Sequence, residues 1–441
     1  MSERKTPQNV DNEISQKLRP TCAVSALNAD MYRVISGYLT REEFRDFLHV
    51  NKHVHGEYIE YRYLSLNKKY SLLYYMNEEF RQRIASLIQN PKRQLSLNLY
   101  GCRNEVSDVS SLGEVHTLNL SHCSTITDVS ALGGVNTLNL SSCYGVSDVR
   151  ALGGVRYLNL SGCTNITHIS NLSDVHNLDL SGCSTITDVS ALCRVNTLNL
   201  SSCGNITDVS LLGGVTTLNL SNCTAITDVS ALGRVVTLIL DGCFRISDVS
   251  FLGAVRTLSL SHCSNVTDVR SLGGVHTLTL SFCSGISVVS ALCGVPNLDL
   301  TQCFNVTDVS ALGEARILNL SNCSGVTDVS ALGRVHTLNL SGCSNVTDVT
   351  ALVGVHSLNV SLCSKITDVS TLGRVHTLNL SRCFIIDNVS ALSTVHTLNL
   401  SGCSGITNVS ALGGVKDLNL SGCSRITNVS ALGRMHTLNL S

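Results

Sequence analysis

The hydrophobic positions of this chain repeat every 20 residues over most of its length. From Ser121 to Ser441, blocks such as SHCSTITDVSALGGVNTLNL return without insertion or deletion. A fixed short period is the signature of a solenoid, in which each repeat stacks only on its neighbours. The 441 residues are therefore expected to form one elongated array with a separate N-terminal head, rather than several globular domains.

Within one repeat, here called a rung, the pattern predicts a strand. In the rung that begins at Val335, Leu338 and Leu340 alternate with polar neighbours, which is the two-residue period of a strand with one buried face. Because a single strand cannot bury its own apolar side, about seventeen rungs are expected to stack and share one elongated core. The fold class predicted is an α/β repeat solenoid with a parallel sheet on its concave face, preceded by a small helical head.

A short capped turn is predicted after each strand. Asp348 precedes the apolar segment 349–352, and its carboxylate is expected to accept free backbone N–H groups at the start of that turn. Asp or Asn occupies this position in most rungs, whereas His168 and Val288 do not supply the same acceptor, so those rungs should be weaker. The glycine column that follows, for example Gly133, is predicted to allow a tight exit from the turn.

The cysteines follow the same period. Sixteen of the 20 lie at one position of the rung, from Cys123 to Cys423, and Cys193 and Cys293 lie elsewhere. Three interpretations compete: buried thiols, disulfides between rungs, and metal sites. Buried thiols are favoured because free cysteine behaves as a small hydrophobe. Disulfides need an oxidising compartment, and metal sites usually show close pairs such as CxxC, which this sequence lacks.

Composition separates the head from the array. Of the 19 Phe and Tyr residues, 12 lie in residues 1–100, so the head has its own aromatic core. The head has a net charge of +4 and the remainder −5, without a basic stripe, and no nucleic-acid partner is predicted. Residues 1–20 are polar and no later apolar run reaches membrane-spanning length, so neither a signal peptide nor a membrane segment is predicted. These features predict a cytoplasmic protein.

Candidate chemistry is repeated rather than singular. Ser, His and Asp recur in equivalent settings, whereas a nucleophile needs one special environment, so we predict no enzyme, no catalytic residue, no cofactor and no metal. The histidine column of four consecutive rungs, His336, His356, His376 and His396, is interpreted as exposed residues at the strand edge. A shared zinc ion and a pH-sensitive surface are the alternatives.

The wet face of the predicted sheet carries nearly uniform Thr and Asn columns, such as Thr377 and Asn379. A surface shaped for one partner usually shows distinct aromatic and Arg anchors, and departures from uniformity gather in the middle rungs, with Phe282 and Arg256 as the expected anchors. Neutral variation among young repeats is the alternative. The predicted partner-binding residues of the repeats are Val236, Ile239, Arg256, Ser259, Thr279, Phe282, Asp299, Gln302 and Ile317.

The head is expected to be helical over residues 29–94, after a weakly ordered segment 1–28 and before the array at 95–441. Thr40 and Glu43 form a capping-box pattern that opens the second of two short amphipathic helices. The aromatic-rich segment from Tyr58 to Leu87 is expected to cover the exposed end of the first rung.

Gly37-Tyr38-Leu39, Phe44, Phe47-Leu48 and Val50-Asn51-Lys52 resemble the central and final parts of an F-box, although the opening Leu-Pro and the Trp after Lys52 are missing. With the repeats, the layout resembles F-box and leucine-rich-repeat proteins, including those of large DNA viruses. That resemblance implies docking on the adaptor subunit of a cullin-RING ubiquitin ligase, with the repeats capturing a target. The docking residues it implies are Val34, Ile35, Tyr38, Leu39, Phe44, Phe47 and Leu48.

The rung itself, with VxxLxLxxC and CxxITDVSAL, is similar to cysteine-containing and internalin-like leucine-rich repeats and to trypanosomal repeat proteins. This similarity implies the fold but not a ligand, so a plain scaffold whose head is only a cap remains the alternative to the ligase adaptor. The sequence stops at Leu440-Ser441, directly after a strand and without a capping segment, and end-to-end self-association is therefore expected.

Overall fold

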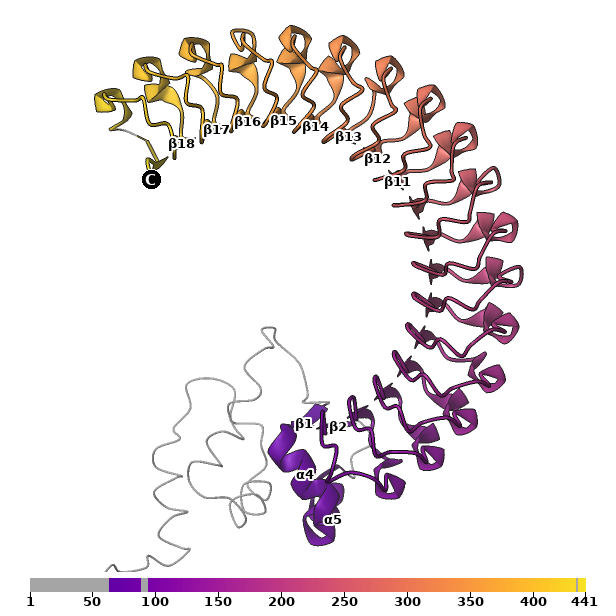
Figure 1. The fold of residues 1–441 in the computed structure, drawn as a ribbon. Coiled ribbons are helices and arrows are strands. Elements are labelled where there is room, and N and C mark those ends of the chain that lie inside the picture. Colours follow the sequence, from indigo (N-terminus) through magenta and orange to yellow (C-terminus); the bar gives the residue numbers. More distant parts are fainter. Residues whose placement is uncertain (1–62, 89–93, 434) are drawn as a thin grey trace, which may run out of the picture.

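The computed structural model describes residues 63–88, 94–433 and 435–441. In this part of the chain, nineteen parallel strands form one sheet. Figure 1 shows the strands along the inner side of a curved arc and the short helical turns along its outer side. The predicted α/β repeat solenoid with a concave parallel sheet is confirmed. The seven docking residues and the two capping-box residues predicted in the head lie outside the described residues.

Seventeen of the strands are three residues long and begin at 20-residue intervals, one per rung. They pair in register, so that Leu338 lies beside Leu318 and Leu358 on the neighbouring strands. The strands are β1 (Tyr63–Leu66), β2 (Gln94–Asn98), β3 (Thr117–Asn119), β4 (Thr137–Asn139), β5 (Tyr157–Asn159), β6 (Asn177–Asp179), β7 (Thr197–Asn199), β8 (Thr217–Asn219), β9 (Thr237–Ile239), β10 (Thr257–Ser259), β11 (Thr277–Thr279), β12 (Asn297–Asp299), β13 (Ile317–Asn319), β14 (Thr337–Asn339), β15 (Ser357–Asn359), β16 (Thr377–Asn379), β17 (Thr397–Asn399), β18 (Asp417–Asn419) and β19 (Thr437–Asn439).

The outer layer consists of short 3₁₀ helices, one per rung. They are η1 (Ser110–Leu112), η2 (Ser130–Gly134), η3 (Arg150–Gly154), η4 (Ser170–Leu172), η5 (Ser190–Arg194), η6 (Leu212–Gly214), η7 (Ser230–Arg234), η8 (Leu252–Ala254), η9 (Arg270–Gly274), η10 (Ser290–Gly294), η11 (Ser310–Leu312), η12 (Ser330–Arg334), η13 (Thr350–Gly354), η14 (Leu372–Arg374), η15 (Ser390–Leu392), η16 (Ser410–Gly414) and η17 (Ser430–Leu432).

The predicted capping of these turns is confirmed. The Oδ1 atom of Asp348 accepts the backbone N–H of Thr350 at 2.9 Å, and Asn408 accepts that of Ser410 at the same distance. These hydrogen bonds satisfy donors that a short helix leaves without a partner. They also stabilise the charged form of the carboxylate, so the pKa of Asp348 lies below its usual value.

The glycine column has a different role from the predicted one. Gly113 ends η1 with φ −64°, an ordinary right-handed conformation, so the predicted tight exit does not require glycine's freedom at positive φ. A Cβ built on Gly113 would instead collide with the backbone carbonyl oxygen of Ala131 in the next rung. Glycine therefore permits close approach of neighbouring rungs. Cys193 and Cys293 occupy this column in two rungs and are exposed.

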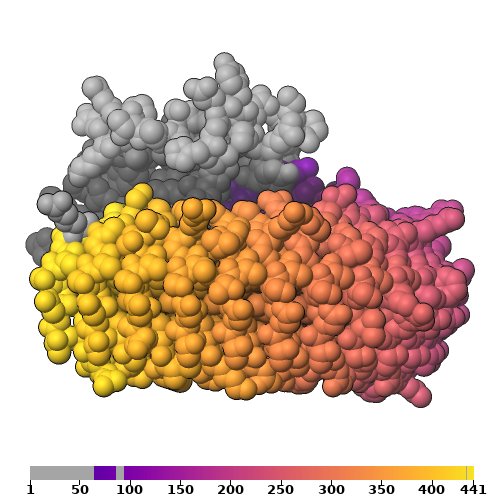
Figure 2. All heavy atoms as spheres, turned by 90° about the horizontal axis from the view of Figure 1, so that it is seen from above, coloured from indigo at the N-terminus to yellow at the C-terminus, as the bar shows by residue number. Residues whose placement is uncertain are grey.

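The core runs through the whole array as one cluster. Figure 2 shows the rungs packed side by side in a continuous band. Each rung between Val115 and Leu412 contributes seven positions that are nearly inaccessible to solvent. Removal of one such leucine side chain costs about 2–5 kcal/mol in comparable cores. In the rung from Val335 the seven positions are Val335, Leu338, Leu340, Cys343, Val346, Val349 and Leu352.

The first end of the described array is built by β1 and two α-helices, α4 (Lys68–Met76) and α5 (Glu78–Ile88). β1 pairs in parallel with β2, which adds a strand that the sequence pattern did not predict. Ser71 links α4 to the sheet, because its hydroxyl donates to Leu66 O at 3.1 Å and accepts Asn98 N–H at 2.9 Å. The buried Tyr70 and Phe80 join the same core as the rungs.

At the other end, the leucines of β19 are more open than their equivalents. Leu438 is 37% exposed and Leu440 is 49% exposed. End-to-end association through this strand stays a prediction. Among the described residues, no helix has the length and apolar character needed to cross a membrane.

Candidate partner-binding surface

The concave asparagine row is part of the backbone structure. After each strand the backbone N–H groups alternate in direction: those of Leu380 and Arg382 donate to carbonyls of the next rung at 2.8 Å each. The N–H of Ser381, between them, donates instead to the Oδ1 atom of Asn379 at 3.0 Å. An orphaned backbone donor is costly. The uniform Asn column therefore satisfies the backbone, which is a structural reason for its repetition.

This row is broken in the middle of the array. Ile239, Ser259 and Thr279 replace Asn on three consecutive strands and lie beside one another in register. One rung makes up for part of the loss, because the Oδ1 atom of Asp241 accepts the Ser261 N–H at 2.9 Å and the Ser259 hydroxyl at 2.5 Å. Asp241 thus accepts the Ser261 N–H, which an Asn at position 259 would otherwise accept.

Sequence reasoning missed Asp241. The signal was present, since Asp241 is the one acidic residue in a column otherwise formed by Ser and Thr from Ser121 to Ser441. The partner of its carboxylate lies in the following rung, about 4.8 Å away across the sheet, and this contact is visible only in the structure.

All nine predicted partner-binding residues lie on five consecutive rungs, β9–β13, which span about 19 Å of the sheet at the usual strand spacing. They fall into three groups. Ile239, Ser259, Thr279 and Asp299 form one row across β9–β12. Val236 and Arg256 directly precede β9 and β10, and Ile317 is the first residue of β13. Phe282 and Gln302 lie in the turns that follow β11 and β12.

This surface combines exposed apolar groups with charge. Val236 and Ile317 are each 44% exposed, and Arg256 is also exposed. The Oδ1 atom of Asp299 accepts both the N–H and the hydroxyl of Thr301, at 2.8 and 2.6 Å. Asp299 therefore keeps the backbone-satisfying role of the missing Asn and adds a negative charge to the row.

Phe282 is the most distinctive side chain of this surface. Its ring stacks on that of His262, with centroids 4.3 Å apart and an interplanar angle of 16°. His262 was not predicted as a member of the site. The backbone of Phe282 has φ +63°, as the turn between Leu280 and Cys283 requires. Nine further non-glycine residues in the described chain share a positive φ, so this conformation belongs to the rung and not to the site.

The cysteine column lies inside the array. Cys343 is fully buried, and its thiol donates to Leu320 O of the preceding rung at 3.0 Å. Burial raises the pKa of this thiol to about 12, so it stays protonated at neutral pH. Equivalent hydrogen bonds recur from Cys123 to Cys423. These features agree with the buried-thiol interpretation.

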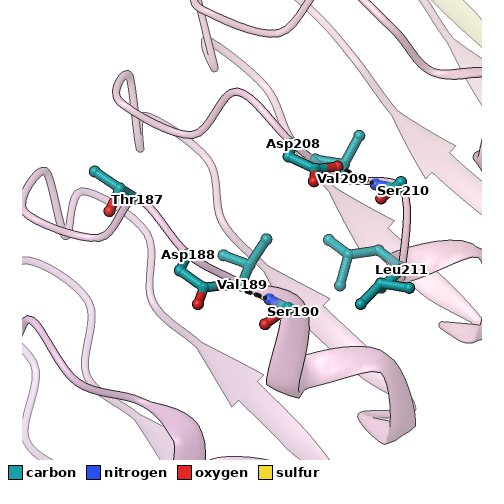
Figure 3. A pocket seen from close by; sticks show the side chains of 9 residues that line it. Thr187, Asp188, Val189, Ser190, Asp208, Val209, Ser210 and Leu211 are labelled. Atoms are coloured by element: carbon teal, nitrogen blue, oxygen red, sulfur yellow. Dashed lines mark hydrogen bonds between the residues drawn. The ribbon is translucent and has the colours of Figure 1, made fainter.

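A hollow of about 240 Å³ lies between two rungs on the side of the 3₁₀ helices. Figure 3 shows Asp188 and Asp208 on its wall, each accepting the N–H of a serine, Ser190 and Ser210 respectively, at 2.9 Å. The helix of the second rung begins only at Leu212, and Leu211 is 58% exposed at a position where most rungs carry Ala. Both carboxylates are committed to the turns, as in the other rungs.

Comparison with known proteins gave structural likenesses only. No protein-family model and no curated protein matches the chain. An internalin, InlF, from Listeria monocytogenes is 23% identical, with 69% of this chain and 84% of that chain covered and a TM-score of 0.40. The functional domain of InlJ from the same organism, described as including a cysteine ladder, is 18% identical, with 77% and 74% covered and a TM-score of 0.41. A leucine-rich-repeat protein of Leptospira interrogans is 16% identical, with 77% and 93% covered and a TM-score of 0.38.

Proposed function

We propose that the chain is a protein-binding scaffold and not an enzyme, and that its partner contacts the concave side of β9–β13. The observation that carries this proposal is the broken asparagine row. Three strands lose the Asn that satisfies the backbone elsewhere, and they present Ile239, Ser259 and Thr279 instead. Asp241 restores one lost acceptor. Compensation of this kind favours retention of the altered surface over neutral variation, because unselected changes do not require it.

The binding energy is expected to concentrate on Phe282 and Arg256, since aromatic and Arg side chains dominate protein interfaces. The test compares the double variant Phe282→Ala/Arg256→Ala with Leu362→Ala/Lys416→Ala, which truncates the equivalent positions in regular rungs. Once proximity labelling has supplied a partner, its Kd should rise about 30-fold in the first variant, the effect of a hot spot of about 2 kcal/mol. It should stay unchanged in the second. Equal Kd values for the two variants would contradict the proposal.

We further propose that the head recruits the adaptor subunit of a cullin-RING ligase, so that the captured protein becomes a ubiquitination target. The support is the F-box resemblance of residues 29–55, together with the scaffold that follows. This role requires the intracellular location that the sequence predicts. Purified adaptor should bind the full chain and lose binding with Leu39→Asp, while Leu39→Met should keep it. If the purified adaptor does not bind the intact chain, the ligase role is refuted, whereas the scaffold proposal is unaffected.

The second candidate is a plain scaffold, and one observation favours it. β1, α4 and α5 already form an N-terminal end to the sheet, with Tyr70 and Phe80 in the shared core. Further residues before Tyr63 are then not needed to cover β2. A plain scaffold predicts that deletion of residues 1–62 leaves both partner binding and the urea midpoint of the array unchanged, and that no ligase subunit binds.

A further inference from the structure

A second surface of the array carries a stack of imidazoles. His336, His356, His376 and His396 precede β14–β17, and their ring centroids are 4.8, 4.7 and 4.5 Å apart in succession. The ring planes deviate from parallel by 25°, 17° and 18°. Because no insertion breaks the 20-residue register, the strand spacing is passed directly to the rings. These four residues are called the histidine ladder below.

The rings of the ladder are oriented by their own rungs. In His336, His376 and His396 the Nδ1 atom lies 3.2, 3.2 and 3.3 Å from the hydroxyl of the threonine that follows. A ring that donates its Nδ1–H to this hydroxyl carries its lone pair on Nε2, at the far side of the ring. This is the arrangement found in metal-binding histidines, whose second nitrogen usually donates to an oxygen.

We propose that adjacent imidazoles of the histidine ladder chelate divalent transition-metal ions such as Zn²⁺ or Ni²⁺ through their Nε2 atoms. With metal–nitrogen bonds of about 2.0–2.1 Å, two nitrogens on one tetrahedral ion lie about 3.4 Å apart. Rings stacked at 4.5–4.8 Å and within 25° of parallel have Nε2 lone pairs that run side by side, so two neighbouring rings must turn out of the stack for these lone pairs to converge on one ion. His336, His356 and His376 are exposed and His396 is half-buried, so the outer edges have room to tilt.

The surroundings set the stoichiometry. In the part of the chain that the structure describes, no group of three or more His, Cys, Asp or Glu side chains is arranged to hold a metal ion. Each ion therefore takes two imidazoles and completes its coordination with water. Four histidines in a row offer at most two separate pairs, so the ladder binds up to two ions.

Charged groups flank the ladder at its two ends. Arg316 lies at the equivalent position one rung before His336, and Lys416 one rung after His396. Asp417 contacts the His436 ring at 3.2 Å and lies 4.0 Å from Nδ1 of His396. Only the neutral ring can bind a metal ion through Nε2, so protonation competes with binding.

The experiment counts bound Zn²⁺ by equilibrium dialysis of the full chain at pH 7.5. Every variant carries Cys193→Ser and Cys293→Ser, because these two thiols are exposed. His356→Asn/His376→Asn leaves no two adjacent imidazoles in the ladder. The matched control is His116→Asn/His276→Asn, since both of these rings contact the hydroxyl of the threonine that follows but have no histidine at the equivalent position of either neighbouring rung. Histidines of the head, such as His53 and His55, are common to all variants.

The ladder variant should lose one or two equivalents of Zn²⁺ relative to its parent, while the control keeps them. Thr377→Val/Thr397→Val should weaken the ladder sites about 10-fold, the effect expected when a second-nitrogen partner of a ligating histidine is removed. Equal numbers of ions and equal affinities in the ladder variant, the control and the parent would overturn the proposal.

Discussion

Asp241→Ser restores the residue that most rungs carry at this position, yet we expect it to destabilise the array. The carboxylate accepts the Ser261 N–H at 2.9 Å and the Ser259 hydroxyl at 2.5 Å. A hydrogen bond to a charged group contributes about 1.5–3 kcal/mol, and the lower value suits a half-buried acceptor. The Ser259 hydroxyl can rotate to donate to water, whereas the backbone N–H of Ser261 cannot turn away. The free energy of unfolding should therefore fall by about 1.5 kcal/mol.

The same change should be nearly harmless in a Ser259→Asn background. There the introduced asparagine side chain would accept the Ser261 N–H locally, as Asn379 does for Ser381. In this background Asp241→Ser should lower the free energy of unfolding by less than about 0.5 kcal/mol, which gives a coupling energy of about 1 kcal/mol between positions 241 and 259. Neither Asp241→Ser nor Ser259→Asn alone reveals this coupling, because each changes only one of the two side chains that can accept the Ser261 N–H.

Hydrogen exchange of the Ser261 amide measures the effect where it arises, since a solenoid can open rung by rung. A loss of about 1.5 kcal/mol corresponds to about 12-fold faster exchange, and Asn379→Ala should give a similar increase at Ser381. In the Ser259→Asn background, Asp241→Ser should change the Ser261 rate by about 2-fold or less. Equal acceleration in the two backgrounds would refute the compensation argument.

Three further predictions follow from the repeated positions. Leu362 has φ +62°, which costs a non-glycine residue about 1–2 kcal/mol. Leu362→Gly relieves this strain but adds the conformational entropy cost of glycine, so the free energy of unfolding in urea should rise by about 0.5–1 kcal/mol. Gly182 has φ +71° and a Cβ there would contact only Gly162, so Gly182→Ala should lower the free energy of unfolding. The turn hydrogen bonds lower the pKa values of Asp308, Asp328 and Asp348. Their stabilisation is therefore present above the unfolded pKa of about 3.9 and lost as pH falls through their lowered folded-state pKa values. Replacing all three with Asn, which accepts the same bond without titrating, should move the acid-unfolding midpoint to lower pH, and an unmoved midpoint would count against this role. Burial raises the pKa values of Cys343, Cys363 and Cys383 to about 12, 11 and 12. Because the unfolded thiols ionise first, stability should fall as pH rises from about 8.5 through these values. The triple change to Ala should reduce the number of protons released on alkaline unfolding, measured by the slope of stability against pH, and an unchanged slope would contradict the assignment.

The short-range features of the fold could be read from the sequence because every rung meets an equivalent neighbour. Alternation at Leu338 and Leu340 identified the strand, and the 20-residue period identified the stacking. Asp348 could be recognised as a cap because its partner, Thr350, is only two residues away. The strand β1 escaped prediction, since segment 63–66 lies outside the period and joins the sheet only through its pairing with β2.

The position of the candidate site was chosen from the sequence and stays a prediction, whereas the hydrogen bonds within it came from the structure. Departures from the repeat marked β9–β13, and the structure brings all nine predicted residues to those rungs. The sequence did not show that the Asn row satisfies backbone donors, because that depends on which N–H groups the neighbouring strand leaves free. The partnership of Asp241 with Ser261 and the stacking of His262 on Phe282 have the same origin in contacts between rungs.

The sequence by itself determined the strand, the capped turn, the buried column of thiols and the number of rungs, because these depend on local periodicity and on stacking of identical units. Only the tertiary structure decided what a side chain at Gly113 would meet, which acceptor serves each free N–H, and how the rings of His336 to His396 lie. These features depend on the distance and angle between adjacent rungs. A 20-residue period predicts that adjacent rungs stack, but the packing of the rungs determines which of their atoms come into contact.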